Sequence, residues 1–281
     1  MPPDQRSAPG PGLRIGVVGA TGRLGSRIVA ECALRDVPVV MTAHSGAWKA
    51  EQPPTVVIDA SRGEVLPRTA VYCRETGSSL IACASDIGSD GDPLLAELAG
   101  SVTVVRAVNL SLGHWLQDHL LGVAGRLLRA SAMPLPCVSL LERHTRAKRD
   151  RPSASARSLA ATWEAHAGGA AVDEVASFRA GHPVSEHAVQ LDFAHESLRL
   201  HHDVRDLSAA APGALAVASW AHGAPAGLVT VKQVYDRLFF ASTHDTDRER
   251  PPAVEPPAVE PPAAESPATE SPATASSFAE T

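Results

Sequence analysis

Long apolar runs are absent from this sequence, and so are the cysteine patterns of disulfide-linked and zinc-binding proteins. No apolar stretch approaches the roughly 20 residues that a transmembrane helix needs, and residues 1–10 lack the apolar centre of a signal peptide. We therefore expect a cytoplasmic protein with no membrane partner. The 4 cysteines lie far apart and form no Cys-x-x-Cys pair, which indicates reduced thiols.

Aromatic side chains are also scarce, and the main part of the chain carries little net charge. Aromatic residues make up 4% of the sequence and hydrophobic residues 44%, so the core is expected to be aliphatic. The formal charge is −6, but five of the negative charges are glutamates in residues 251–281, which leaves about −1 for the rest. A nearly neutral body excludes the basic surface of a nucleic-acid-binding protein and favours a small-molecule partner.

The C-terminal segment repeats a five-residue unit rich in proline, alanine and glutamate, beginning at Pro251. Repeated prolines favour extended backbone, and evenly spaced like charges repel one another, so such a segment cannot build a core. We expect a disordered tail over residues 242–281 and a flexible leader over residues 1–12.

Short aliphatic runs alternate with helical patterns in the first part of the chain. The run at residues 13–18 leads through a glycine-rich turn into a helix over residues 26–34. Further runs lie at 37–41, 55–58, 79–83 and 102–105, with helical stretches at 66–76 and 93–98. This alternation predicts an α/β fold with an N-terminal Rossmann-type, doubly wound parallel sheet over residues 13–112.

The pattern changes after residue 112. A strongly amphipathic helix over residues 113–129 is followed by candidate strands at 137–141, 174–180, 184–193 and 196–202. These predict a smaller α+β domain with a mixed sheet at residues 113–208. The alanine-rich segment 209–241 is expected to return as helix to the first domain.

The glycine-rich turn reads Gly19-Ala-Thr-Gly22-Arg-Leu-Gly25. Such glycines permit a tight turn, close backbone approach to a pyrophosphate, and close packing of the next helix, whose N-terminus faces the anion. The turn therefore predicts an NAD(P) site, and the alternative is a structural turn without a ligand. The expected cofactor contacts here are Gly19, Thr21, Gly22, Arg23, Leu24 and Gly25.

Cofactor preference is usually determined where the second strand ends, by a carboxylate for NADH or an arginine for NADPH. The chain reads Thr42-Ala-His44-Ser there and has neither residue. The cofactor is therefore expected to be NADPH or NADH, with the choice open. His44 is a candidate contact for a phosphate or the adenine, and an exposed loop histidine is the equal alternative.

Residues 142–156 combine a titratable histidine, a lysine and a serine-rich turn in one connection. His144 can carry or release a proton near neutral pH, and Lys148 is a compact positive charge. Ser153 and Ser155 flank the turn after Pro152. The set suits an anion site with a proton donor for a small carboxylate; the alternative is a solvated basic loop.

Several motifs, taken in chain order, resemble the dihydrodipicolinate reductase family over roughly residues 13–238. The central pattern Glu-x-His-x-x-x-Lys-x-Asp-x-Pro-Ser is the most specific of them. The motifs are Gly19-Ala-Thr-Gly-Arg-Leu-Gly25, Asp59-Ala-Ser-Arg-Gly-Glu64, Asn109-Leu-Ser-Leu-Gly113, Glu142-Arg-His-Thr-Arg-Ala-Lys148, Asp150-Arg-Pro-Ser-Ala-Ser155 and Glu186-His187.

Members of that family reduce a cyclic imine-type dicarboxylate on the path to lysine, use NADH or NADPH, and are commonly homotetramers. The resemblance therefore implies a small cyclic imine acid as substrate and a homo-oligomer, a tetramer, as the assembly. It also assigns substrate binding and oligomerisation to the domain at residues 113–208. It makes His144 the proton donor and Lys148 the cation that holds the substrate. The remaining implied contacts are Ala60, Ser61 and Asn109 for the cofactor, and Thr145, Ser153, Ala154 and Ser155 for the substrate.

The chain departs from the family pattern in the substrate pocket. Thr145 replaces a second histidine, Ala154 replaces a glycine expected to need close approach or positive φ, and Leu207 replaces an arginine. Arg205 is a possible substitute for that arginine, and Asp86 lies near the expected nicotinamide.

These departures lead to three hypotheses about function. The first is an NAD(P)H-dependent reductase of a related cyclic imine or enamine carboxylic acid, with a changed substrate in a specialised pathway. The second is a true 4-hydroxy-tetrahydrodipicolinate reductase of lysine biosynthesis, and the third is a non-catalytic dinucleotide-binding regulator or scaffold.

A metal site is the remaining alternative because the chain contains 12 histidines. No His-x-x-x-His pattern is present, and adjacent histidines on a strand point to opposite faces, so we expect no metal. His187 stays open between an interdomain hydrogen bond and catalysis.

Overall fold

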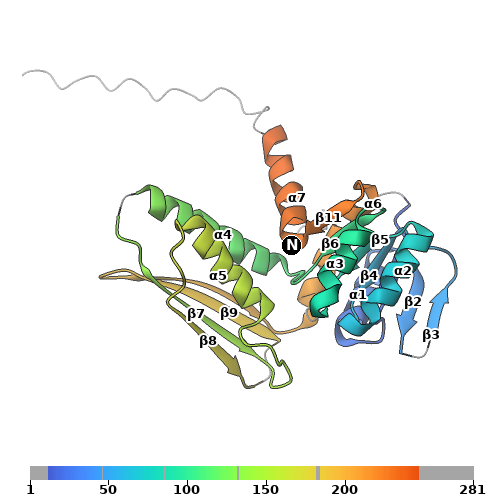
Figure 1. The fold of residues 1–281 in the computed structure, drawn as a ribbon, viewed down its shortest axis with the longest axis horizontal. Coiled ribbons are helices and arrows are strands. Elements are labelled where there is room, and N and C mark those ends of the chain that lie inside the picture. Colours follow the sequence, from blue (N-terminus) through green and yellow to red (C-terminus); the bar gives the residue numbers. More distant parts are fainter. Residues whose placement is uncertain (1–11, 46, 85–86, 132, 182–183, 247–281) are drawn as a thin grey trace, which may run out of the picture.

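The computed structural model describes residues 12–45, 47–84, 87–131, 133–181 and 184–246. Two sheets, each covered by helices, lie side by side in the molecule (Figure 1). The expected leader lies outside the described residues, except for Gly12. Asp86 and the part of the expected tail after Thr246 also lie outside them.

Sheet A is the Rossmann-type sheet, with strand order β11-β6-β5-β4-β1-β2-β3. Its neighbouring strands pair in parallel except for β3, which runs antiparallel to β2 at the edge. The central strands are buried on both faces, as expected for a sheet covered by helices on each side. The strands are β1 (Ile15–Val18), β2 (Val39–His44), β3 (Ala47–Ala50), β4 (Val56–Asp59), β5 (Ser79–Ala82), β6 (Thr103–Arg106) and β11 (Gly227–Thr230).

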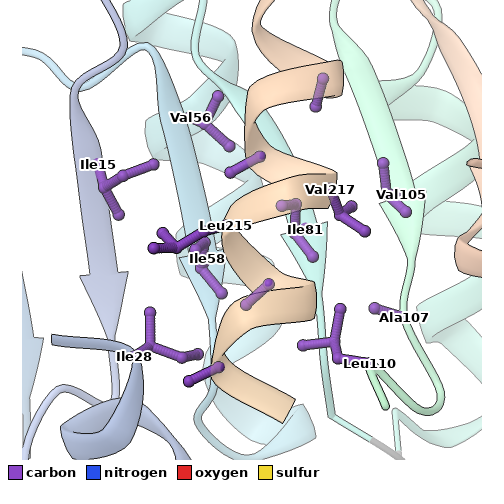
Figure 2. Close-up of a cluster of buried hydrophobic side chains, with 14 of the residues drawn as sticks. Ile15, Ile28, Val56, Ile58, Ile81, Val105, Ala107, Leu110, Leu215 and Val217 are labelled. Atoms are coloured by element: carbon purple, nitrogen blue, oxygen red, sulfur yellow. The ribbon is translucent and has the colours of Figure 1, made fainter. Parts of the chain in front are cut away.

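Helices cover both faces of sheet A. On one face, α1 (Arg23–Leu34) and α6 (Ala211–Gly223) pack over the central strands, and residues at the start of α7 (Val231–Thr246) join the same core. Figure 2 shows Leu215 and Val217 of α6 among the aliphatic side chains of the sheet. On the other face lie α2 (Leu66–Thr76), which follows a short 3-10 turn, and α3 (Gly88–Leu98).

Sheet B is mixed, with strand order β10-β9-β7-β8. It contains β7 (Cys137–His144), β8 (Glu174–Arg179), β9 (Ser185–Asp192) and β10 (Ser197–Val204). Two helices, α4 (Leu112–Ala130) and α5 (Ala154–His166), cover one face of it (Figure 1). Because side chains alternate along a strand, β7 directs Val138, Leu140, Glu142 and His144 toward these helices, and all four are buried.

The predicted fold class, a doubly wound sheet with a smaller α+β unit, is confirmed. Three element predictions need correction. The segment 209–241 contains the strand β11, whose four residues are too few for a clear periodicity. Helix α7 continues to Thr246, beyond the expected start of the tail at residue 242. Helix α5 begins within what we expected to be a turn, where the Ser153 hydroxyl caps the first helical turn.

The described part of the chain offers no helix with the length and apolarity required to cross a bilayer. The cysteines are free thiols.

Candidate functional site

The glycine-rich turn connects β1 to α1 and forms a cradle with no side chain at Gly19, Gly22 or Gly25. Gly19 has φ +78°, and a Cβ added there would lie 2.9 Å from the carbonyl oxygen of Ala60. A Cβ at Gly25 would collide with the carbonyl oxygen of Gly19. Gly22 is the N-cap of α1 and provides no side-chain cap, so the first N–H groups of the helix remain open to an anion.

These residues fit the pyrophosphate of a dinucleotide. Thr21, Gly22 and Arg23 are exposed, so their backbone and side chains are accessible to a ligand. Leu24 instead packs against the core of sheet A, which makes its side chain structural. The backbone geometry of the cradle therefore fits the pyrophosphate of a dinucleotide.

The expected contacts beyond the cradle have mixed environments. His44 is exposed at the end of β2, on the same edge as the cradle. The Ala60 N–H donates to the carbonyl of Val18 at 2.9 Å, so that group already has a partner. Ser61 donates to the Asp59 carboxylate through its N–H at 2.9 Å and its hydroxyl at 2.5 Å. Asp59, which is buried, therefore holds this loop in place.

A cavity of about 640 Å³ opens at the carboxyl ends of β4 and β5. Ser61 and Arg62 line it from sheet A, and Arg149 reaches it from the connection between β7 and α5. Ligands of doubly wound sheets bind at this edge. Another hollow, of about 370 Å³, lies at the opposite edge near Arg14 and Ser79, remote from every motif described above.

Asn109 links the two halves of the molecule. It lies between β6 and α4, and its Nδ2 donates to the Ser155 hydroxyl at 3.2 Å. Its Oδ1 accepts from the N–H of Ser111 at 3.0 Å, which fixes the amide in this orientation. Asn109 therefore joins the connection out of sheet A to the start of α5.

Glu142 is the centre of a buried polar network beside that connection. Its side chain is 0% exposed and accepts hydrogen bonds from the Ser153 N–H at 3.1 Å and the Ser177 hydroxyl at 2.6 Å. The Arg179 guanidinium, 2% exposed, donates to it at 2.7 Å. Burial alone would raise the pKa of the Glu142 carboxyl, but hydrogen bonds from His144 and these groups hold it well below its ordinary value. The carboxylate is therefore ionised at neutral pH.

His144 lies next to this carboxylate and is buried. Its Nδ1 lies 3.1 Å from the carbonyl oxygen of Val184, so Nδ1 carries a proton and donates it there. Its Nε2 faces Oε2 of Glu142 at 3.4 Å, a longer contact than the hydrogen bonds that Glu142 accepts from Ser177 and Arg179. The ring is therefore held between a backbone carbonyl and a buried carboxylate.

Lys148 is a partly exposed cation of the connection between β7 and α5. Its Nζ lies 2.9 Å from the Asp150 carboxylate, and its side chain is 23% exposed. Burial opposes ionisation of Asp150, but the hydrogen bond from Lys148 and the charge of Lys148 give that carboxyl a lowered pKa. The backbone N–H of Lys148 closes a turn on the carbonyl of Thr145, at 3.2 Å.

The start of α5 is a second helix N-terminus with the geometry to hold an anion. The Ser153 hydroxyl accepts from the N–H of Ala156 at 3.1 Å and lies 3.2 Å from Nε2 of His187, so Ser153 positions the loop. Residues 154 and 155 occupy the first helical turn, where N–H groups lack partners within the helix and favour a carboxylate. Among the described non-glycine residues only Asp36 has positive φ, so Ala154 is accommodated without strain. The expectation that this position needs glycine is wrong on its positive-φ argument.

The possible substitution of Arg205 for the missing arginine is not supported. Arg205 pairs with Asp203 at 3.1 Å, and its side chain is 90% exposed. Leu207 begins a short 3-10 turn over Leu207–Ala210 and brings no charge. The second anion contact of the family pattern is therefore absent at these positions.

Histidines from three elements meet on the inner face of sheet B. His114 of α4, His187 of β9 and His202 of β10 have ring nitrogens within 4.8 Å of one another. Burial lowers the pKa of His114 to about 4 and that of His187 to about 3, so both rings are neutral at pH 7. The sequence argument against a metal considered only spacing along single elements, whereas these three histidines come together from separate elements through tertiary packing.

Sequence reasoning gave no role to Glu142, Arg179 or Arg149. The alternation along β7 could have identified Glu142, because it shares a face with Val138 and Leu140 and a buried carboxylate needs a partner. The role of Arg179 depends on the pairing of β8 with β7, which brings it to Glu142. The role of Arg149 depends on the tertiary position of the connection after β7, which brings it to the cavity at sheet A.

Comparisons with known proteins agree with this architecture. The family model described as "Dihydrodipicolinate reductase, C-terminus" matches residues 116–235. A 4-hydroxy-tetrahydrodipicolinate reductase from Stenotrophomonas maltophilia is 32% identical over 179 residues, which cover 64% of this chain and 72% of that relative. The Myxococcus xanthus protein of the same name is 30% identical over a match that covers 75% of this chain and 85% of that relative.

Among solved structures, a dipicolinate-bound dihydrodipicolinate reductase from Paenisporosarcina sp. TG-14 matches with a TM-score of 0.62. It is 15% identical, and the match covers 79% of this chain and 98% of that chain. At this identity the likeness concerns the fold.

Proposed function

The chain belongs to the dihydrodipicolinate reductase family and is an NAD(P)H-dependent oxidoreductase, and from this premise we propose that its substrate is 4-hydroxy-tetrahydrodipicolinate. The names of its relatives support this substrate. The observation that carries the proposal is the arrangement of His144, Lys148 and the start of α5 around one connection, which reaches the cavity at the edge of sheet A through Arg149.

Each part of this arrangement has a chemical role in the proposal. The cradle from Gly19 to Gly25 holds the pyrophosphate, and bound NAD(P)H supplies the hydride that reduces the conjugated ring. Lys148 and the first N–H groups of α5 bind a substrate carboxylate and orient it. His144 delivers, from its Nε2 atom, the proton that completes the reduction. Glu142 stabilises the ring while it carries a positive charge.

The test is oxidation of NADH and NADPH by the purified protein while dihydrodipicolinate synthase generates the substrate in place. Turnover with either cofactor supports the proposal. Cofactor binding with no turnover would favour the regulator hypothesis, and absence of both binding and turnover would contradict the assignment altogether.

A second candidate, a cyclic imine with a single carboxylate, is favoured by one observation. Leu207 stands where the family pattern has arginine, and Arg205 is turned to solvent. A charged hydrogen bond is worth about 1.5–3 kcal/mol, so its loss weakens binding of a second carboxylate roughly tenfold to a hundredfold.

Leu207→Arg is therefore expected to raise kcat/KM for the dicarboxylate by about tenfold or more, with little change for a monocarboxylate. The measurement compares both substrate classes in the same assay. Ser208→Arg is the matched control, since it adds the same charge one position away. Equal gains from both variants, or no gain from Leu207→Arg, would contradict this account of the pocket.

A further inference from the structure

Three histidine rings lie against one another beneath the start of α4. The ring centre of His114 is 5.8 Å from that of His187 and 6.2 Å from that of His202. His114 is 7% exposed and His187 is 0% exposed. The three candidate ligands are all imidazoles, and Oε2 of Glu142 lies 3.8 Å from Nε2 of His187.

Each ring has a buried nitrogen without a hydrogen-bond partner among the described residues, and in all three it is Nδ1. A buried polar atom without a partner is destabilising, and such atoms are rare in folded proteins. Three of them in one cluster point to a single ligand that accepts lone pairs from all three.

The other nitrogen of two rings is fixed by a hydroxyl. Nε2 of His187 lies 3.2 Å from the Ser153 hydroxyl, and Nε2 of His202 lies 3.2 Å from the Ser111 hydroxyl. Histidines that bind metals typically use one nitrogen for the ion and anchor the other through a hydrogen bond. Gly113 also leaves room for the ring of His202, because a Cβ there would lie 2.8 Å from it.

We propose that His114, His187 and His202 together bind one Zn²⁺-type transition-metal ion through their Nδ1 atoms. Imidazole nitrogens suit this class of ion, at bond lengths of about 2.0–2.1 Å. One ring nitrogen of each histidine lies within 4.8 Å of the others, so the three rings already approach a common centre. The ion ties α4 to β9 and β10, and through His187 it holds Ser153, the N-cap of α5.

The first test is metal analysis of the full-length protein after incubation with Zn²⁺ and desalting. We expect about one ion per chain, and less than about one tenth of an ion in His114→Leu. His201→Ala is the matched control, because His201 neighbours His202 on the same strand, is 47% exposed and lies 3.3 Å from Glu186. The control should keep the ion.

Two measurements on the unaltered protein, the shift in Tm with Zn²⁺ and the visible spectrum with Co²⁺, do not depend on whether a variant folds. Zn²⁺ at about a hundredfold above its Kd should raise Tm by about 5–10 °C. Co²⁺ should give the intense visible absorption of a tetrahedral site, and His202→Gln should remove it. A protein that retains no ion and shows no change in Tm overturns the proposal. None of these readouts depends on turnover, so a failed reductase assay leaves this test unaffected.

Discussion

His144→Asn should lower kcat by about 10²- to 10⁴-fold, because asparagine cannot deliver a proton. The amide can still donate to the carbonyl of Val184, as the ring does through Nδ1. Binding of NADH or NADPH should be unchanged, since the cradle at the start of α1 is separate from β7. Steady-state kinetics and cofactor titration measure the two quantities.

The control for this variant is His195→Asn, at an exposed position between β9 and β10. It should retain full activity. If His144→Asn also kept kcat within about threefold, the proton would come from another group and the role assigned to His144 would be wrong.

Glu142→Ala should lower the free energy of unfolding by about 3–5 kcal/mol, because it leaves the guanidinium of Arg179 buried and without its charge partner. The variant also removes the acceptor for the Ser153 N–H and the Ser177 hydroxyl. Urea unfolding followed by circular dichroism measures the loss.

Two comparisons separate this effect from a general cost of substitution. Glu186→Ala removes a carboxylate whose partner Arg143 is 48% exposed, and should cost less than about 1 kcal/mol. The double variant Glu142→Leu with Arg179→Met should lose less stability than Glu142→Ala alone, because no buried charge is left unpaired. A double variant at least as unstable as the single one would contradict this explanation.

The parts of the fold that could be predicted are those with local signals. Elements β1 and α1 are predicted from local sequence alone: an aliphatic run at residues 13–18, a glycine-rich turn and a helical pattern after it. The predicted strands of sheet B also lie close to the observed ones, because inward and outward positions alternate in β7 and β9.

The parts that could not be predicted depend on tertiary contacts. His114, His187 and His202 come from three elements, and no spacing in the sequence relates them. The cavity beside Arg149 forms only where the connection after β7 reaches the edge of sheet A. Helix α5 could not be predicted because its alanine-rich pattern gives little periodicity, so the sequence places Ser153 in a turn and not at the N-cap that it forms.

The most direct test of the central claim, that the connection between β7 and α5 binds the substrate carboxylate, compares Lys148→Ala with Arg146→Ala in the coupled reductase assay. Arg146 is an exposed cation of the same connection. Removal of a charged hydrogen bond should lower kcat/KM of Lys148→Ala by about tenfold to a hundredfold or more, while cofactor affinity and the activity of Arg146→Ala stay unchanged. Equal activity of Lys148→Ala and the unaltered enzyme would contradict the claim.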